Sequence, residues 1–174
     1  PNAIMLQFTT NHDENSWNGT INSRMGVAQS AFAVFTFTTQ GTPLLYNGQE
    51  VCLNKSLRFF VRDTIKWDSC KMTPFYTNLI KLKKANKALW NGEFGGTMDT
   101  IAAGKPRSVF AFYREKDDNR VVVFLNLRKK EVSIKPDLEN IKGEYTDYFS
   151  GVKVTLPFAD SLKFEPYGYK VFVR

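Results

Sequence analysis

The residues best suited to chemistry lie in two polar clusters, each of which follows an apolar run. The first cluster, residues 11–15, places His12, the only histidine, beside Asp13. An aspartate next to a sugar ring can accept hydrogen bonds from hydroxyl groups and can stabilise the positive charge of an oxocarbenium-like transition state. A lone histidine is more often a packed structural residue, and an aspartate here could also cap a loop. Both interpretations stay open on these residues alone.

The second cluster contains Gln49 and Glu50 and follows the short apolar run of residues 44–46. In parallel α/β sheets and barrels, functional residues collect at the C-terminal ends of the strands, so the two clusters predict one common site. Trp17 could stack on a sugar face or pack within its own loop. Tyr46 could do the same, and core packing is the more usual role for a strand aromatic.

The elements that must position these clusters follow from the apolar pattern. Near-continuous apolar runs at residues 3–10 and 44–46 predict strands buried on both faces of a parallel sheet. Residues 24–38 predict a buried helix with Ser23 as its N-cap, and Gly41 and Pro43 end it. Strand, helix and strand together predict a βαβ unit. Residues 51–73 predict no regular element, and residues 75–89 predict an amphipathic helix that Thr73 and Pro74 would start.

After residue 92 the pattern changes to short β-branched and aromatic runs separated by turns. Residues 117–119, Asp-Asp-Asn, predict a hairpin turn. Short strands at this spacing predict an antiparallel sandwich or barrel. We therefore expect two domains, an α/β domain over residues 1–93 and an all-β domain over residues 94–174. The expected strands are 97–102, 108–115, 120–127, 131–135, 143–149, 152–156 and 167–173.

Charge and composition exclude some classes of function. The net charge of +7 comes from 10 Lys and Arg against 6 Asp and Glu before residue 94, and from 14 against 11 after it. A nucleic-acid reader concentrates its charge on one face and carries a recognition motif, and we find none. The sequence contains no run of 18 apolar residues, so it predicts no membrane span. We expect no nucleic-acid partner and no metal site within this chain, and its compartment is left open.

The two cysteines, Cys52 and Cys70, are 18 residues apart and lie outside any zinc-like pattern. They could pair in an exported protein or stay free thiols, and we favour free thiols. The chain opens at Pro1, without Met or a signal peptide, and reaches an apolar run by Ile4. We expect it to be part of a longer protein.

Two blocks carry a specific resemblance to a known family. Residues 8–13, ending in Asn11-His12-Asp13, resemble the block at the seventh barrel strand of the α-amylase family. Residues 41–50 resemble that family's Gly-x-Pro-x-x-Tyr-x-Gly-x-Glu block around the eighth strand. Residues 74–84 resemble the last barrel helix, and the chain from residue 94 is similar to the family's C-terminal β domain. The resemblance implies a partial (β/α)8 barrel remnant followed by a β-sandwich.

The resemblance also implies roles for individual residues. Asp13 matches the catalytic carboxylate that holds sugar hydroxyls and steadies the transition state, and His12 matches the histidine that hydrogen-bonds the sugar at the point of cleavage. We expect Trp17 to contact substrate. The residues expected to support the site from behind are Arg24, Tyr46, Gln49 and Glu50.

The nucleophile and the acid/base carboxylate of this family come from its fourth and fifth strands, and no segment here resembles either block. A retaining hydrolase of starch or maltooligosaccharides is therefore expected only of a longer protein, and the chain alone should be inactive. Calcium ligands in this family also lie mainly outside the matching region. The alternative is an amylase-like domain that binds glycan or has a structural role without catalysis.

Two strands cannot close a barrel, so strands at 3–10 and 43–46 would leave open edges and an uncovered apolar face. We expect an oligomer or a complementing chain to cover residues 1–90.

Overall fold

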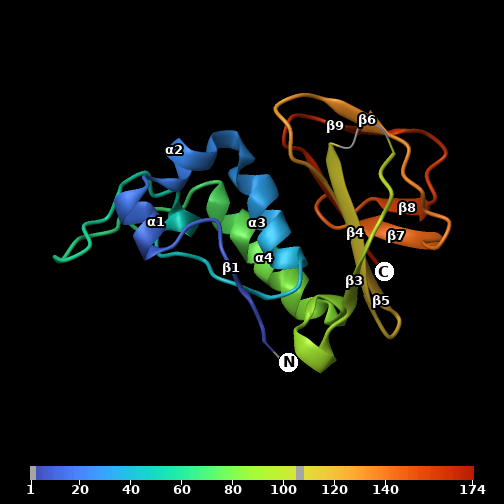
Figure 1. The fold of residues 1–174 in the computed structure, drawn as a ribbon, viewed down its shortest axis with the longest axis horizontal. Helices are drawn as coiled ribbons and strands as arrows, with labels where there is room; N and C mark the ends of the chain where they lie inside the picture. Colours follow the sequence, from blue (N-terminus) through green and yellow to red (C-terminus); the bar gives the residue numbers. More distant parts are fainter. Residues whose placement is uncertain (1–2, 105–107) are drawn as a thin grey trace.

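A computed structural model describes residues 3–104 and 108–174 of the chain. A six-stranded antiparallel sheet separates two layers: helices pack on one of its faces and a two-stranded sheet packs on the other (Figure 1). The strand order of the large sheet is β3-β4-β5-β10-β7-β8, and the small sheet pairs β6 with β9. The N-terminal strands form a separate parallel pair, β1-β2.

Residues 3–94 contain two short strands and four α-helices, with short 3-10 turns between them. The elements are β1 (Leu6–Gln7), α1 (His12–Trp17), α2 (Ile21–Met25), η1 (Gly26–Ala28), α3 (Gln29–Thr38), β2 (Thr42–Pro43), η2 (Gln49–Val51), α4 (Met72–Ala85), η3 (Lys87–Leu89) and η4 (Gly92–Phe94). The remaining elements are strands, namely β3 (Thr97–Thr100), β4 (Val109–Lys116), β5 (Asn119–Asn126), β6 (Val132–Ile134), β7 (Gly143–Asp147), β8 (Lys153–Leu156), β9 (Leu162–Phe164) and β10 (Tyr169–Val173).

The strand β5 lies at the centre of the molecule and is buried on both faces. Val121, Val123 and Leu125 point to the helix layer, where they pack against residues of α3 and α4. Val122 and Phe124 alternate with them and pack against β6 and β9. Because successive side chains of a strand point to opposite faces, this burial requires an uninterrupted apolar run, and β5 has one. The core on the helix side crosses residue 93, and the proposed domain boundary there stays a prediction.

The prediction of an antiparallel β domain is confirmed, with differences at the strand ends. The hairpin turn at Asp117 and Asp118 joins β4 to β5, with Lys116 opposite Asn119. Asp117 adopts a positive φ of 53°, which short polar residues tolerate in hairpin turns. The strand β9 was not predicted, because three residues are too few for a period-two pattern to stand out.

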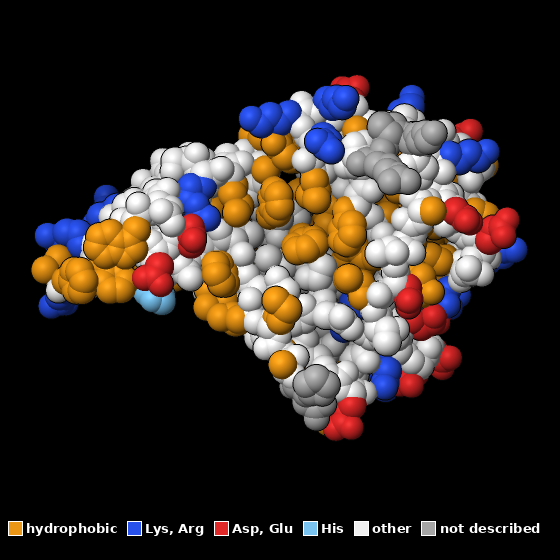
Figure 2. Space-filling model, viewed as in Figure 1, with side chains coloured by type: hydrophobic (Ala, Val, Ile, Leu, Met, Phe, Trp, Pro, Cys, Tyr) orange, Lys and Arg blue, Asp and Glu red, His pale blue; other side chains and the backbone are white. Residues whose placement is uncertain are grey.

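The strand prediction for residues 3–10 was wrong about burial. Only Leu6 and Gln7 pair, with Thr42 and Pro43 of β2, and the apolar side chains nearby are exposed. Residues 44–46 are half-buried and follow β2 without joining a ladder, although the Leu44 amide donates to the Gln7 carbonyl over 2.8 Å. Figure 2 shows the resulting apolar side chains gathered over β1 and the α2–α3 segment. The exposed residues of the β1 segment are Ile4, Met5, Leu6 and Phe8.

The helix starts also differ from the prediction. The helical segment begins at Ile21, where Thr20 and not Ser23 is the cap: the Thr20 hydroxyl accepts from the Ser23 amide over 3.1 Å. Gly26, with φ of 51°, interrupts the predicted single helix and separates α2 from α3. Similarly, α4 begins at Met72, so Thr73 and Pro74 lie within its first turn.

Cys52 and Cys70 form a disulfide with a Cα–Cα distance of 6.1 Å, so the preference for free thiols was wrong. Spacing in sequence could not reveal that η2 and the start of α4 lie side by side. There, the Thr73 hydroxyl also donates to the Glu50 carbonyl over 2.8 Å. The disulfide closes the base of the irregular segment of residues 53–69.

Candidate functional site

Both polar clusters lie at the C-terminal edge of the β1-β2 pair, as the sequence predicted. The pair is parallel, with Leu6 opposite Thr42, so both strands end on the same side. A side-chain bridge joins the two ends: the Gln49 amide donates to the Thr9 hydroxyl over 2.7 Å. Gln49 and Thr9 are buried, so this bond fixes one cluster against the other away from water.

His12 and Asp13 form the first turn of α1. Asn11 caps this helix, its side-chain oxygen accepting from the Glu14 amide over 2.8 Å. The His12 and Asp13 side chains are 63% and 59% exposed, and His12 Nε2 lies 3.5 Å from Asp13 Oδ2. The cap explains why a polar cluster follows the strand, and it leaves both candidate side chains free to reach a ligand.

Arg24 supports this turn from behind. Its guanidinium forms a 2.8 Å ion pair with Glu14 and donates to the Thr10 hydroxyl over 3.5 Å. Both side chains of the ion pair are about a quarter to a third exposed. Arg24 therefore ties the end of β1 to α1, and it does not itself contact Asp13 in any described interaction.

Gln49 is the centre of the second cluster. Besides Thr9, its amide donates to the Tyr76 hydroxyl of α4, and its side-chain oxygen accepts from the Tyr46 amide over 3.2 Å. Burial raises the pKa of Tyr76, whose hydroxyl is thus held in its neutral form. Burial also raises the pKa of Tyr46. Glu50 leaves one buried carboxylate oxygen without a hydrogen-bond partner in the described part of the chain.

Trp17 faces the irregular segment and not the second cluster. Its ring lies 5.5 Å from Phe59 and 6.2 Å from Phe60, and the His12 ring lies 5.7 Å from Phe59 (centroid distances). Sequence reasoning did not select Phe59 and Phe60, because they lie in a segment without periodicity. Two adjacent phenylalanines within a polar loop were the only available signal.

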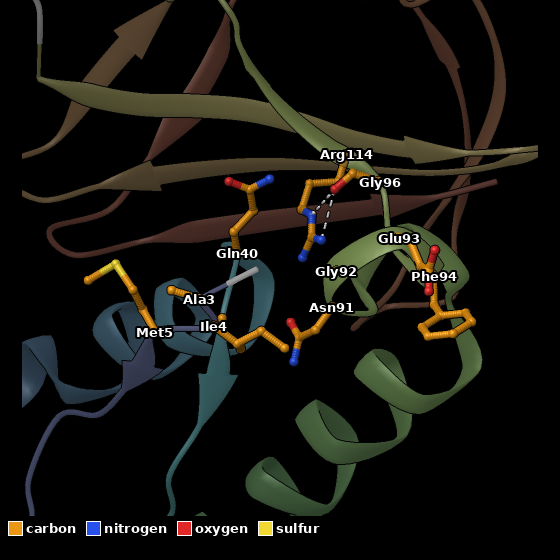
Figure 3. A pocket seen from close by; sticks show the side chains of 11 residues that line it. Ala3, Ile4, Met5, Gln40, Asn91, Gly92, Glu93, Phe94, Gly96 and Arg114 are labelled. Atoms are coloured by element: carbon orange, nitrogen blue, oxygen red, sulfur yellow. Dashed lines mark hydrogen bonds between the residues drawn. The ribbon is translucent and has the colours of Figure 1, made fainter. Parts of the chain in front are cut away.

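A separate cavity of about 560 Å³ lies between the start of the chain, the η4 turn and Arg114 (Figure 3). The Arg114 side chain is buried and donates to four backbone carbonyls, those of Thr39, Leu89, Trp90 and Gly96, at 2.7–3.2 Å. Since the guanidinium has five N–H donors and these bonds use them, it offers none to a ligand. Arg114 instead fastens the helix layer to β4.

Within residues 3–104 and 108–174, no group of three or more His, Cys, Asp or Glu side chains could hold a metal ion. None of the helices described is long and apolar enough to cross a membrane.

Comparison with known proteins finds similarity to amylases and cyclomaltodextrinases. Residues 98–171 match the family described as the C-terminal domain of maltogenic amylase. "Alpha-amylase 2" of Dictyoglomus thermophilum is 27% identical over 184 residues, which cover 97% of this chain and 29% of that protein. A cyclomaltodextrinase of a Bacillus species is 33% identical over 97 residues, 53% of this chain and 17% of its own length. The chain spans less than a third of the length of each of these curated relatives.

Solved structures agree on the fold. A maltogenic α-amylase from Thermotoga neapolitana superposes with a TM-score of 0.77 at 20% identity, over 98% of this chain and 41% of that one. An α-amylase from Lactobacillus plantarum superposes with a TM-score of 0.74 at 17% identity, over 99% and 38% respectively. Both likenesses extend over the helical part and the β part of the chain.

Proposed function

Because this chain is a relative of the α-amylase glycoside hydrolases, we propose that it is the C-terminal part of a retaining hydrolase of α-glucans such as starch or maltooligosaccharides. Its relatives are amylase-type glycosidases, and each is longer than this chain. The proposal assigns residues 1–93 to the last two strands and helices of a (β/α)8 barrel, and the rest to the β domain that follows it.

The observation that carries the proposal is the parallel register of β1 and β2. This register brings the segments that carry Asp13 and Gln49 to one edge of the strand pair, and the hydrogen bond from Gln49 to Thr9 holds the two segments together. In barrels of this type the catalytic groups come from the C-terminal ends of several strands, so an edge of this kind is one sector of an active site.

In the proposed site Asp13 accepts hydrogen bonds from the hydroxyls of the sugar undergoing cleavage. Its negative charge stabilises the oxocarbenium-like transition state, and His12 donates to a hydroxyl of the same ring. Trp17 adds an apolar surface beside them. The nucleophile and the acid/base lie about 5–5.5 Å apart in a retaining enzyme and must come from outside residues 1–174. The chain alone is then inactive.

The exposed β1 segment supports the same proposal. Ile4, Met5, Leu6 and Phe8 are 41–69% exposed, which is unusual for a run of this kind. We infer that further barrel strands cover it, either from the same polypeptide or from a complementing chain. This covering accounts for a segment that has the apolar pattern of a buried strand but whose side chains are exposed in this chain.

The test compares the chain with a longer product that includes the coding sequence before Pro1, using maltoheptaose and a cyclomaltodextrin as substrates. We expect hydrolysis only by the longer product. Asp13→Asn in that product should lower kcat/KM by at least about 100-fold, because it removes a charge that acts in the transition state. The exposed Asp160→Asn is the matched control and should stay near the wild-type value.

If the longer product binds maltoheptaose without hydrolysing it, the protein is a glycan-binding relative and the enzymatic proposal is wrong. Equal activities of Asp13→Asn and Asp160→Asn would also reject the role of Asp13.

A further inference from the structure

Three exposed aromatic rings lie next to the proposed site and have no assigned role. Trp17, Phe59 and Phe60 are 60%, 41% and 84% exposed. The Phe59 and Phe60 centroids are 4.9 Å apart, and both rings lie within 6.2 Å of Trp17. We call these three residues the aromatic shelf. Figure 2 shows apolar side chains gathered at this end of the molecule, beside the histidine.

The loop that carries the shelf is fixed at several points. The Asn15 side chain donates to the Lys55 carbonyl over 3.1 Å and accepts from the Leu57 amide over 2.7 Å. The Ser16 hydroxyl donates to the Leu57 carbonyl over 2.7 Å. With the disulfide at its base, the loop is tied to the same helix, α1, that carries His12 and Asp13. A surface fixed in this way loses little entropy when it binds a ligand.

A second fixed point lies within the loop. The Asp63 carboxylate accepts from the Arg58 and Thr64 amides over 3.1 and 2.8 Å, and it pairs with Lys55. These contacts lower the pKa of Asp63, the hydrogen bond from Lys55 contributing most. The carboxylate thus stays charged and keeps the turn that presents Phe59 and Phe60.

The shelf forms one wall of a hollow of about 350 Å³ that also contains polar groups. Its lining combines the three rings with Ser16, Ser56 and Arg58. The Ser16 hydroxyl, whose hydrogen goes to Leu57, can still accept, and the Ser56 hydroxyl can donate or accept. Such groups beside flat apolar rings suit a neutral polyol, because one face of a glucose ring presents C–H groups and its edge presents hydroxyls. Pockets with mostly apolar walls and a few placed polar groups are typical ligand sites.

We propose that the aromatic shelf binds glucosyl units of the α-glucan chain adjacent to the unit held by His12 and Asp13. The contact of His12 with Phe59, at 5.7 Å between centroids, makes the shelf continuous with the proposed site. The choice of an α-glucan as ligand rests on the proposed function. The shelf is a binding subsite and has no part in the chemical step.

The experiment titrates the chain with maltoheptaose and follows the amide resonances by NMR. We expect millimolar binding that perturbs residues 16–17 and 56–61. Phe60→Ala should weaken it about three- to tenfold, the contribution of one aromatic ring, and Phe60→Tyr should restore it. Phe94→Ala is the matched control: Phe94 is 67% exposed on η4, away from the shelf, and its loss should leave binding unchanged.

Several results would overturn the inference: no perturbation of the shelf at saturating maltoheptaose, or equal weakening by Phe60→Ala and Phe94→Ala. Self-association that Phe60→Ala abolishes, with no sugar-dependent change, would make the shelf a protein interface instead. The binding assay needs no catalysis. If the shelf binds maltoheptaose but a longer product has no hydrolase activity, only the proposed function is contradicted. If the longer product hydrolyses maltoheptaose but the sugar does not bind at the shelf, only this inference is contradicted.

Discussion

The segment around β1, residues 3–8, and the strand β5 both contain apolar runs, but their surroundings are opposite. In β5, Val121 to Leu125 are fully buried between the helix layer and the small sheet. In the β1 segment, Leu6 is 54% exposed and pairs with only one short strand. The difference lies in the neighbouring elements. The strand β5 has a paired strand on both sides and a packed layer on both faces, whereas β1 has one paired strand and exposed apolar neighbours. An apolar run therefore indicates that a strand is suited to burial, and the neighbouring elements determine whether the strand is buried.

The largest expected effect compares the same substitution in these two strands. Leu125→Ala should lower the free energy of unfolding by about 2–5 kcal/mol, since it leaves a cavity in a packed core. Leu6→Ala should change it by less than about 0.5 kcal/mol, because the side chain is largely in water. Urea unfolding of the isolated chain measures both. Similar losses for the two variants would show that β1 is covered in solution, for example by a second copy.

Loss of the disulfide should have the next largest effect, and it concerns the region around the shelf. Replacing Cys52 and Cys70 together by Ser should destabilise the chain by about 3 kcal/mol, the value for closing a loop of this length. Amide hydrogen exchange should rise mainly in residues 53–71, and the β domain should keep its protection. Wild-type chain treated with a reductant is the control and should match the variant. Unchanged exchange in that loop would mean that the α1 contacts suffice to hold it.

The smallest effect concerns Lys83 of α4, which joins this helix to the segments before β2 and after α4. Its ammonium donates to the Gly41 and Leu89 carbonyls over 3.1 and 2.8 Å. Burial, and secondarily the charge of Arg114, lower the pKa of Lys83 to about 8. Above pH 8 the folded chain has released this proton while the unfolded chain still holds it, so stability should rise with pH up to about 10.

Urea unfolding between pH 7 and 9.5 tests this. Lys83→Met should flatten the rise, although it also lowers stability at every pH because two carbonyls lose a donor. Lys81→Met, at an exposed position of the same helix, should keep the wild-type slope. A slope that survives in Lys83→Met would assign the titration to another group.

The sequence predicted the pairing of the two segments that carry the polar clusters more closely than it predicted the bounds of the elements. The common edge of Asp13 and Gln49 followed from two polar clusters after two apolar runs, and the parallel register confirms their adjacency. The roles of Asp13, His12 and Trp17 stay predictions. Helix starts were less accurate, because Thr20 and Ser23 are both good caps and only the backbone geometry at Gly26 decides where the helix is interrupted.

Local sequence determined the apolar run of β5, the hairpin turn at Asp117 and the polar segments after β1 and β2, because each depends on residues close in sequence. Contacts between distant segments decided the rest. The Cys52–Cys70 bond, the Arg114 carbonyl contacts and the meeting of His12 with Phe59 each join residues at least 18 positions apart. No local pattern encodes such pairs, since their proximity arises only when the packed layers bring the segments together.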